Sequence, residues 1–245
     1  MILHWDETFI NIVSNVIVNF YKITNSFPLE YADIYYCDDI CKDVNIFVPD
    51  KPLLNATGGL TIPPSDSMKN KFTVIINKSY DAEMLFSLAH ELCHAKDFND
   101  YCKINNIIDY SELSHDKNFH LLVRWSEFHT KLFDNRILLM NIYPDNPNVI
   151  KESLLDTYIR NINDKIFKKA TDKNISADDY LWYIGEWAYL SNILSEKEFN
   201  NILLENEEFI QETILHNLFS FLKSHQNIQE MQGAWQDFAD ILQGK

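Results

Sequence analysis

The chain has 245 residues, 46% of them hydrophobic, which is enough for one large domain or two small ones around a buried core. Only 5 glycines and 7 prolines argue against a turn-rich all-β fold and favour long helices. The 21 basic and 36 acidic residues leave a net charge of −15, which would repel a phosphate backbone. We therefore expect no direct contact with nucleic acid.

The N-terminal segment has apolar residues at helical spacing from Trp5 to Phe20, which predicts an amphipathic helix packed on a core. It lacks the basic region and the small-residue cleavage site of a signal peptide. No apolar stretch reaches the roughly 18 residues that a membrane-spanning helix needs. These features predict a soluble, cytoplasmic protein that does not contact a membrane.

Residues 33–77 contain short β-favouring runs separated by Pro, Gly, Asn and Asp: ADIYYC, VNIFVP, GLTIPP and FTVIIN. Gly58 and Gly59 are expected to supply positive-φ turn geometry before a strand. A phosphate-binding loop is disfavoured, because no Lys-Ser or Lys-Thr pair follows the glycines. Cys37 and Cys41 resemble half of a metal site, but no second cysteine pair with such spacing follows, so reduced thiols are favoured.

From about residue 80 onward the sequence is mainly helical. Helices are predicted over approximately 79–98, 118–143, 150–170, 176–194, 197–223 and 227–242, and the loop at 143–148 is the best boundary between two regions. Residues 174–245 contain 3 basic and 12 acidic residues, so they contribute 3 − 12 = −9 to the net charge. We interpret this region as a helical bundle that closes the domain. A docking surface for a basic partner and an occluding regulatory segment are the alternatives.

The stretch AHELCH carries the clearest chemical signal. On a helix, His90 and His94 lie four residues apart on one face and can bind one metal ion. Glu91 lies beside them, where its carboxylate can reach an activated water molecule. A buried structural pair of histidines is the alternative, but it would not require Glu at the intervening position.

A catalytic zinc site needs three protein ligands and one open position. Asp100 is a weak candidate for the third ligand, because Asp97 stands where the His-x-x-Gly-x-x-His extension requires glycine. Glu127 is the stronger candidate, since a carboxylate on a mainly apolar helix is costly unless it is paired or binds a metal. A salt bridge from Glu127 to Arg124 or Lys131 is the alternative.

The segments TGGLTIPP, FTVIINKS, LFSLAHELCHAKDF and EFHTKLFDNRIL together resemble the ImmA/IrrE metallopeptidases over about residues 56–140. The pattern of that family is a glycine-led strand, an edge strand ending in Asn, a metal helix with Ala-His-Glu, and a later Glu-x-x-Ala-Asn-x-Phe-Ala helix. Here Thr130, Lys131 and Asp134 replace Ala, Asn and Ala, and Cys93 stands where Gly is usual. The chain therefore resembles a divergent member that keeps each chemical residue.

The resemblance implies a zincin-like metallopeptidase domain. Together with the helical pattern that follows, it predicts an α+β fold with this domain at residues 1–145 and a helical C-terminal region at residues 146–245. It implies Zn²⁺ bound by His90, His94 and Glu127, with Glu91 as the base that takes a proton from water and passes it to the leaving amine. The aromatic position of the pattern falls on Phe133.

The predicted substrate is a protein or peptide that adds as an extended strand to the edge strand 72–77. The substrate-binding residues would be Thr73, Val74, Ile75, Ile76 and Asn77. An edge strand protected by Lys71 and Lys78 is the simpler interpretation, and both can hold. The candidates for stabilising the oxyanion are His120, His129 and Tyr110.

The ImmA/IrrE resemblance also implies that the substrate is a separate protein, such as a DNA-binding transcriptional repressor. The sequence has no recognisable helix-turn-helix and no basic patch of its own, and it does not indicate an oligomeric state. The competing hypothesis is a catalytically idle protein that keeps the fold as a binding or sensor module, of the phage or toxin–antitoxin type.

Overall fold

The computed structural model describes residues 7–38, 40, 58–64, 70–78, 82–161, 177–205 and 213–244. The chain folds into two compact units. The first consists of Met1–Phe119 and Phe133–Pro144, and the second of His120–Leu132 and Asp145–Lys245. The described residues are rich in helix and include a small mixed sheet, which confirms an α+β composition.

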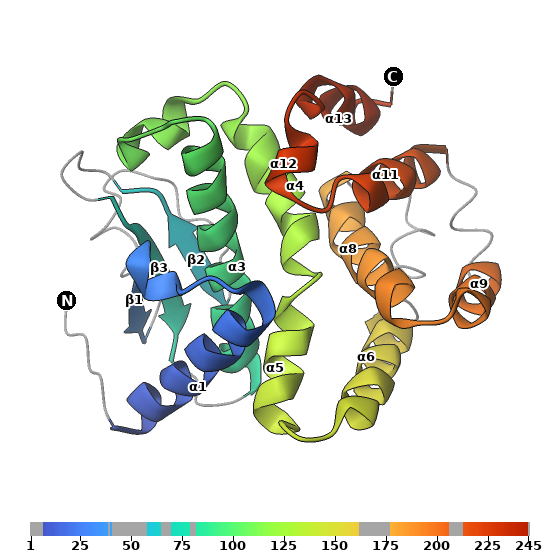
Figure 1. The fold of residues 1–245 in the computed structure, drawn as a ribbon, viewed down its shortest axis with the longest axis horizontal. Coiled ribbons are helices and arrows are strands. Elements are labelled where there is room, and N and C mark those ends of the chain that lie inside the picture. The colour runs from blue at the N-terminus through green and yellow to red at the C-terminus, as the bar shows by residue number, and fades with distance from the viewer. Residues whose placement is uncertain are drawn as a thin grey trace. The chain divides into compact units, whose positions relative to one another are not determined.

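The sheet of the first unit has three described strands: β1 (Ala32–Cys37), β2 (Gly59–Ile62) and β3 (Phe72–Asn77) (Figure 1). Their order is β1-β3-β2, with β1 parallel and β2 antiparallel to β3. The prediction that residues 72–77 form an edge strand is therefore wrong, because β3 is paired on both sides. The run at 44–49, also expected to favour a strand, lies outside the described residues.

The two faces of the sheet have different roles. On one face, Ile34, Val74 and Ile76 are buried. Phe72 on the same face contacts Phe98 of helix α3 (Ala82–Ile104), with the two ring centroids 5.8 Å apart. Because side chains alternate along a strand, Gly59 and Thr61 of β2 belong to this helix-facing side. The opposite face carries a smaller apolar cluster, which consists of Ile40, Ile62 and Ile75 with Cys37 and Leu60.

Helix α3 (Ala82–Ile104) is the central helix of the first unit and contacts β2, β3, α1 (Glu7–Thr24) and α5 (Asp134–Ile142). It extends beyond the predicted end near residue 98, because Tyr101 and Cys102 continue its buried surface. It ends in a Schellman motif, in which the Ile107 N–H donates to the Cys102 carbonyl at 2.8 Å. Asn106 adopts the required positive φ of 57°.

The single helix predicted over residues 118–143 is two helices, α4 (Phe119–Thr130) and α5, separated by a turn. The Thr130 hydroxyl donates to the Glu127 carbonyl at 3.0 Å, and such bonds from Thr back to the preceding turn bend helices. The next two amides form tighter turns, in which Lys131 donates to Phe128 and Leu132 donates to His129. Thr130 is one of the positions at which the sequence departs from the ImmA/IrrE pattern.

The second unit contains α4 residues from His120 onward and six further helices with described bounds. They are α6 (Pro147–Asn161), α8 (Ala177–Ile193), α9 (Glu196–Glu205), α11 (Thr213–Ser224), α12 (Ile228–Met231) and α13 (Trp235–Leu242). Residues 162–170 and 206–212 of the predicted helices lie outside the described residues, and the helix predicted over 227–242 is broken into α12 and α13.

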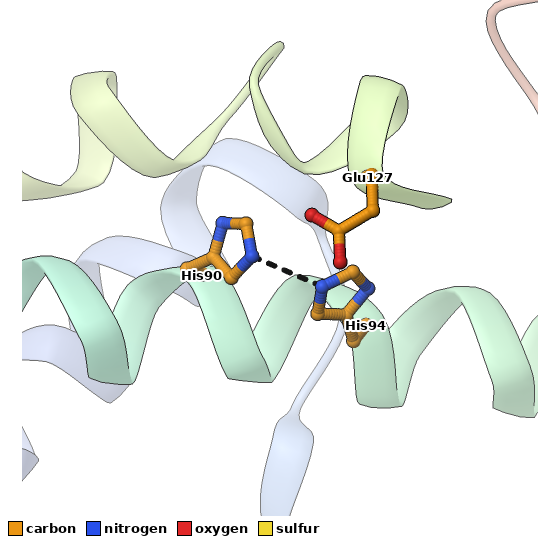
Figure 2. Close-up of side chains that lie close together, drawn as sticks. All are labelled: His90, His94 and Glu127. Atoms are coloured by element: carbon orange, nitrogen blue, oxygen red, sulfur yellow. Dashed lines mark hydrogen bonds between the residues drawn. The ribbon is translucent and has the colours of Figure 1, made fainter. Parts of the chain in front are cut away.

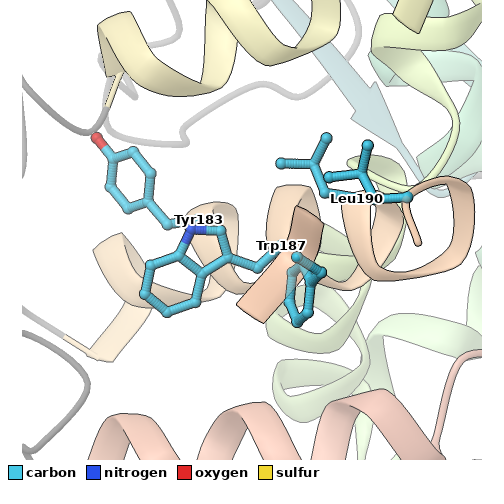
Figure 3. Close-up of a cluster of buried hydrophobic side chains, with 5 residues drawn as sticks. Tyr183, Trp187 and Leu190 are labelled. Atoms are coloured by element: carbon cyan, nitrogen blue, oxygen red, sulfur yellow. The ribbon is translucent and has the colours of Figure 1, made fainter. Parts of the chain in front are cut away.

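Among the described helices of the second unit, α8 contributes the largest number of buried hydrophobic residues. Tyr183, Trp187 and Leu190 pack together with Leu194 and Phe199 (Figure 3). The helix predicted over residues 176–194 is confirmed, and its buried residues also include Tyr180, Leu181, Ile184, Glu186, Ala188 and Tyr189. None of the helices in the described part of the chain has the length and apolar character needed to cross a bilayer.

Candidate metal centre

His90 and His94 lie one turn apart on α3, and their imidazole rings converge (Figure 2). Their Nε2 atoms are 3.0 Å apart. The His94 residue is 6% exposed, and the His90 side chain is 13% exposed. The helical spacing predicted from the sequence is thus confirmed, and it brings two nitrogen ligands together.

Glu127 of α4 completes a group of three possible ligands with His90 and His94. One ligand atom from each residue lies within 4.8 Å of the others, and Figure 2 shows the carboxylate facing the two rings. The other candidate, Asp100, accepts a hydrogen bond from Lys96 Nζ at 2.6 Å and is not a member of this group. The structure therefore favours Glu127 over Asp100 as the third ligand.

The group suits zinc by the chemistry of its ligand atoms, since two imidazoles and one carboxylate form a common catalytic zinc set. Two nitrogens bound to one tetrahedral zinc at about 2.0–2.1 Å would be about 3.3 Å apart. The observed Nε2–Nε2 distance of 3.0 Å needs only a small adjustment to reach that value. The residues present therefore fit a zinc ion.

Asp134 is a component of the site that the sequence analysis noted only as a departure from the family pattern. Its carboxylate is fully buried at the start of α5, and its Oδ2 atom is 3.1 Å from His90 Nδ1. A proton on Nδ1 then donates to the carboxylate, which leaves His90 Nε2 with a lone pair for a metal. The contact depends on the turn after α4, which the sequence analysis did not predict.

Glu91 points from α3 towards β2 and is 7% exposed. Its Oε2 atom accepts a hydrogen bond from the Thr61 hydroxyl at 2.7 Å, and the same hydroxyl lies 2.9 Å from the Glu91 carbonyl oxygen. Thr61 and Glu91 therefore fix each other's side chains. Thr61 is a further residue that the sequence analysis missed, and the alternation of side chains along GLTI was the available signal.

The pair Gly58 and Gly59 has a different role from the one predicted. Neither residue has a positive φ, since the described glycines with positive φ are Gly233 and Gly244. A Cβ atom at Gly59 would lie 2.5 Å from Glu91 Cγ, and one at Gly58 would overlap Ser87 Oγ. The glycines thus permit the close approach of β2 to α3.

Gly59→Ala is expected to destabilise the protein, because the added methyl group cannot fit against the Glu91 side chain. Overpacking of this kind costs about 1–3 kcal/mol. Replacing glycine with alanine also lowers the conformational entropy of the unfolded chain, which stabilises a protein by about 0.4–1 kcal/mol. The cost of overpacking outweighs this stabilisation. Urea denaturation monitored by circular dichroism measures the change in the free energy of unfolding.

A double variant distinguishes this contact from other effects of alanine in a strand. Glu91→Ala removes the Cγ atom that would clash, so Gly59→Ala should cost less in the Glu91→Ala background than in the wild type. An equal cost in both backgrounds, or no cost in the wild type, would contradict the proposed packing of Gly59 against Glu91.

The residues predicted to bind substrate, Thr73–Asn77, belong to the central strand. Their backbone partners are on β1 and β2, and the Asn77 N–H donates to the Gly58 carbonyl at 3.0 Å. The Asn77 side-chain oxygen accepts a hydrogen bond from the Ile40 amide at 3.1 Å. An added strand therefore cannot pair with β3 unless an existing strand leaves it.

The three candidates for stabilising an oxyanion have different environments. His120 is exposed, and His129 is buried with its ring stacked on Trp125 at a centroid distance of 4.5 Å. The Tyr110 hydroxyl donates to Asn99 Oδ1 at 2.8 Å, and burial raises the pKa of Tyr110. Tyr110 would have to give up this hydrogen bond to act on a substrate.

The described cysteines do not add to this site. Burial, followed by the nearby Asp116 carboxylate, raises the pKa of Cys102 to about 12, so it remains a thiol at neutral pH. Cys37 donates a weak hydrogen bond to the Ile76 carbonyl at 3.7 Å. The alternative site at Cys37 and Cys41 depends partly on residue 41, which lies outside the described residues.

Comparisons with models of protein families, with curated proteins and with solved structures found no match for this chain. The ImmA/IrrE resemblance and the zincin-like fold therefore stay predictions, carried by the motifs and by the geometry of the site.

Proposed function

We propose that the protein is a zinc-dependent endopeptidase in which His90, His94 and Glu127 bind the metal and Glu91 is the general base. The observation that carries this proposal is that the three possible ligands have ligand atoms within 4.8 Å of one another, while Glu91, which follows His90 in sequence, accepts a hydrogen bond from the adjacent strand. A structural histidine pair would require neither Glu127 nor an oriented Glu91.

His90, His94 and Glu127 would hold a zinc ion, which would acidify a water molecule and polarise the carbonyl group of a peptide. Glu91 accepts the proton of the attacking water and transfers it to the leaving amine. The Thr61 hydroxyl binds one carboxylate oxygen of Glu91 and restricts its rotamer. The other oxygen then remains available for proton transfer, so β2 positions the base.

An extended substrate is proposed to pair with β2 rather than with β3. Among the described strands, β2 is an edge strand, and it carries both Gly59 and Thr61 next to Glu91. A peptide that adds to the outer edge of β2 would gain backbone hydrogen bonds close to the proposed base. This assignment replaces the one made for Thr73–Asn77.

The substrate is proposed to be a separate protein with a neutral or basic segment around the cleavage site. The net charge of −15 supports this preference, since an acidic protein attracts basic partners and repels acidic ones. A DNA-binding regulator, implied by the resemblance, fits the preference because such proteins are often basic.

Cleavage that depends on zinc tests the proposed function. The zinc-loaded protein is incubated with a mixture of synthetic peptides of diverse sequence, and new termini are identified by mass spectrometry. We expect cleavage that stops when a chelator removes the metal and returns when stoichiometric zinc is added. A folded, zinc-loaded protein that cleaves no peptide or protein would contradict the proposal and favour the binding module.

A further inference from the structure

Asp134 is a fully buried carboxylate at the start of α5. Burying an ionised carboxylate is costly unless other groups compensate for the lost water. His90 Nδ1, which lies 3.1 Å from Oδ2, and the Asn135 backbone N–H, which donates to Oδ1, are among the groups that do so. The first turn of a helix also favours negative charge. Asp134 is therefore held in place from several directions.

We propose that Asp134 positions His90 for metal binding. The inference rests on the proposed zinc centre and adds a residue outside its ligand set. When Nδ1 carries the proton and donates it to Asp134, Nε2 must present its lone pair, and the ring plane is fixed by the same bond. Nε2 is the atom that lies 3.0 Å from His94 Nε2, on the side where the ligands converge.

The position of Asp134 follows from the local fold. The turn after Thr130 ends α4 and lets α5 begin at Asp134, and α5 packs on α3, the helix that carries His90. Both residues belong to the first unit, so this contact does not depend on Glu127. The ImmA/IrrE pattern has Ala at this position, so the carboxylate is a feature of this chain and not of the motif.

The test compares the zinc affinities of the wild type, Asp134→Ala, Asp134→Asn and the control Asp145→Asn. Asp145 is an exposed loop residue, so its variant removes one negative charge without touching His90. Each dissociation constant is measured by competition with a chromogenic chelator. We expect Asp134→Ala to bind zinc about 10–100-fold more weakly, the range found when partners of metal ligands are removed.

Asp134→Asn should retain part of the affinity, because its amide oxygen can still accept the Nδ1 proton although the charge is lost. Nitrogen NMR of the imidazole rings reports which ring nitrogen carries the proton. This position would not change if Asp134 only stabilised the fold. His90 should keep its proton on Nδ1 in the wild type and populate both tautomers in metal-free Asp134→Ala. If Asp134→Ala does not fold, Asp134→Asn, which preserves the shape of the side chain, provides the affinity measurement.

The outcomes separate this inference from the proposed function. Zinc affinity of Asp134→Ala and Asp134→Asn within twofold of the wild type, or unchanged tautomers in Asp134→Ala, would overturn the role of Asp134. A folded wild type that binds no zinc would overturn both the metal centre and this role. Weakened zinc binding in the variants, with no peptide cleaved by the wild type, would support the role of Asp134 and count only against the peptidase.

Discussion

We expect the wild type to bind one zinc per chain and alanine at His94 or Glu127 to remove most of that zinc. Even the hydrogen-bond partners of metal ligands contribute about 10–100-fold to metal affinity, so the loss of a ligand should cost more than about 100-fold. The measurement is elemental analysis of variants that were loaded with zinc in the same way and freed of excess metal by gel filtration.

Two control variants make this comparison specific. His115→Ala removes an imidazole whose side chain is 78% exposed, and Glu152→Ala removes an exposed carboxylate from α6. Both should retain the zinc content of the wild type. Full zinc retention by Glu127→Ala would instead show that another residue is the third ligand. In that case Asp100→Ala would be the next variant, although Asp100 is paired with Lys96.

The outline of the fold was predictable from the sequence because its signals are local. Helical spacing predicted α1, α3 and α8, and β-favouring runs predicted the three described strands. The order of the strands was not predictable, since β3 looks the same in sequence whether one or both of its edges are paired. The break after Thr130 was also missed, because the helical pattern of apolar residues continues across it and neither Pro nor Gly marks it in the sequence.

The site was predictable to the extent that it is encoded in spacing. His90, Glu91 and His94 follow from a short motif on one helix, and Glu127 follows from a carboxylate on an apolar helix. Thr61 and Asp134 were missed, because each contacts α3 only after distant segments pack together. The role of Gly58 and Gly59 was predicted wrongly, since it is close packing against α3 and not positive φ.

Glu91→Gln is expected to abolish most peptide cleavage and to leave zinc binding intact. The amide keeps the size of the carboxylate and can still accept the Thr61 hydrogen bond, but it cannot take a proton from water. Loss of a general base lowers the rate by about 10²–10⁴-fold. The fall should appear in kcat, measured on the best peptide found with the wild type, while zinc content and thermal stability stay close to their wild-type values.

Glu83→Gln is the matched control, because Glu83 is an exposed residue of the same helix and lies two turns before Glu91. Its kcat should equal that of the wild type. If Glu91→Gln cleaves as fast as the wild type, Glu91 is not the base and another group must accept the proton. If cleavage is lost together with zinc, the variant has disturbed His90 and His94, and the zinc occupancy must be restored before the role of the base is judged. Loss of cleavage with full zinc occupancy is the result that distinguishes a peptidase from a protein that uses the same metal centre only to bind a partner.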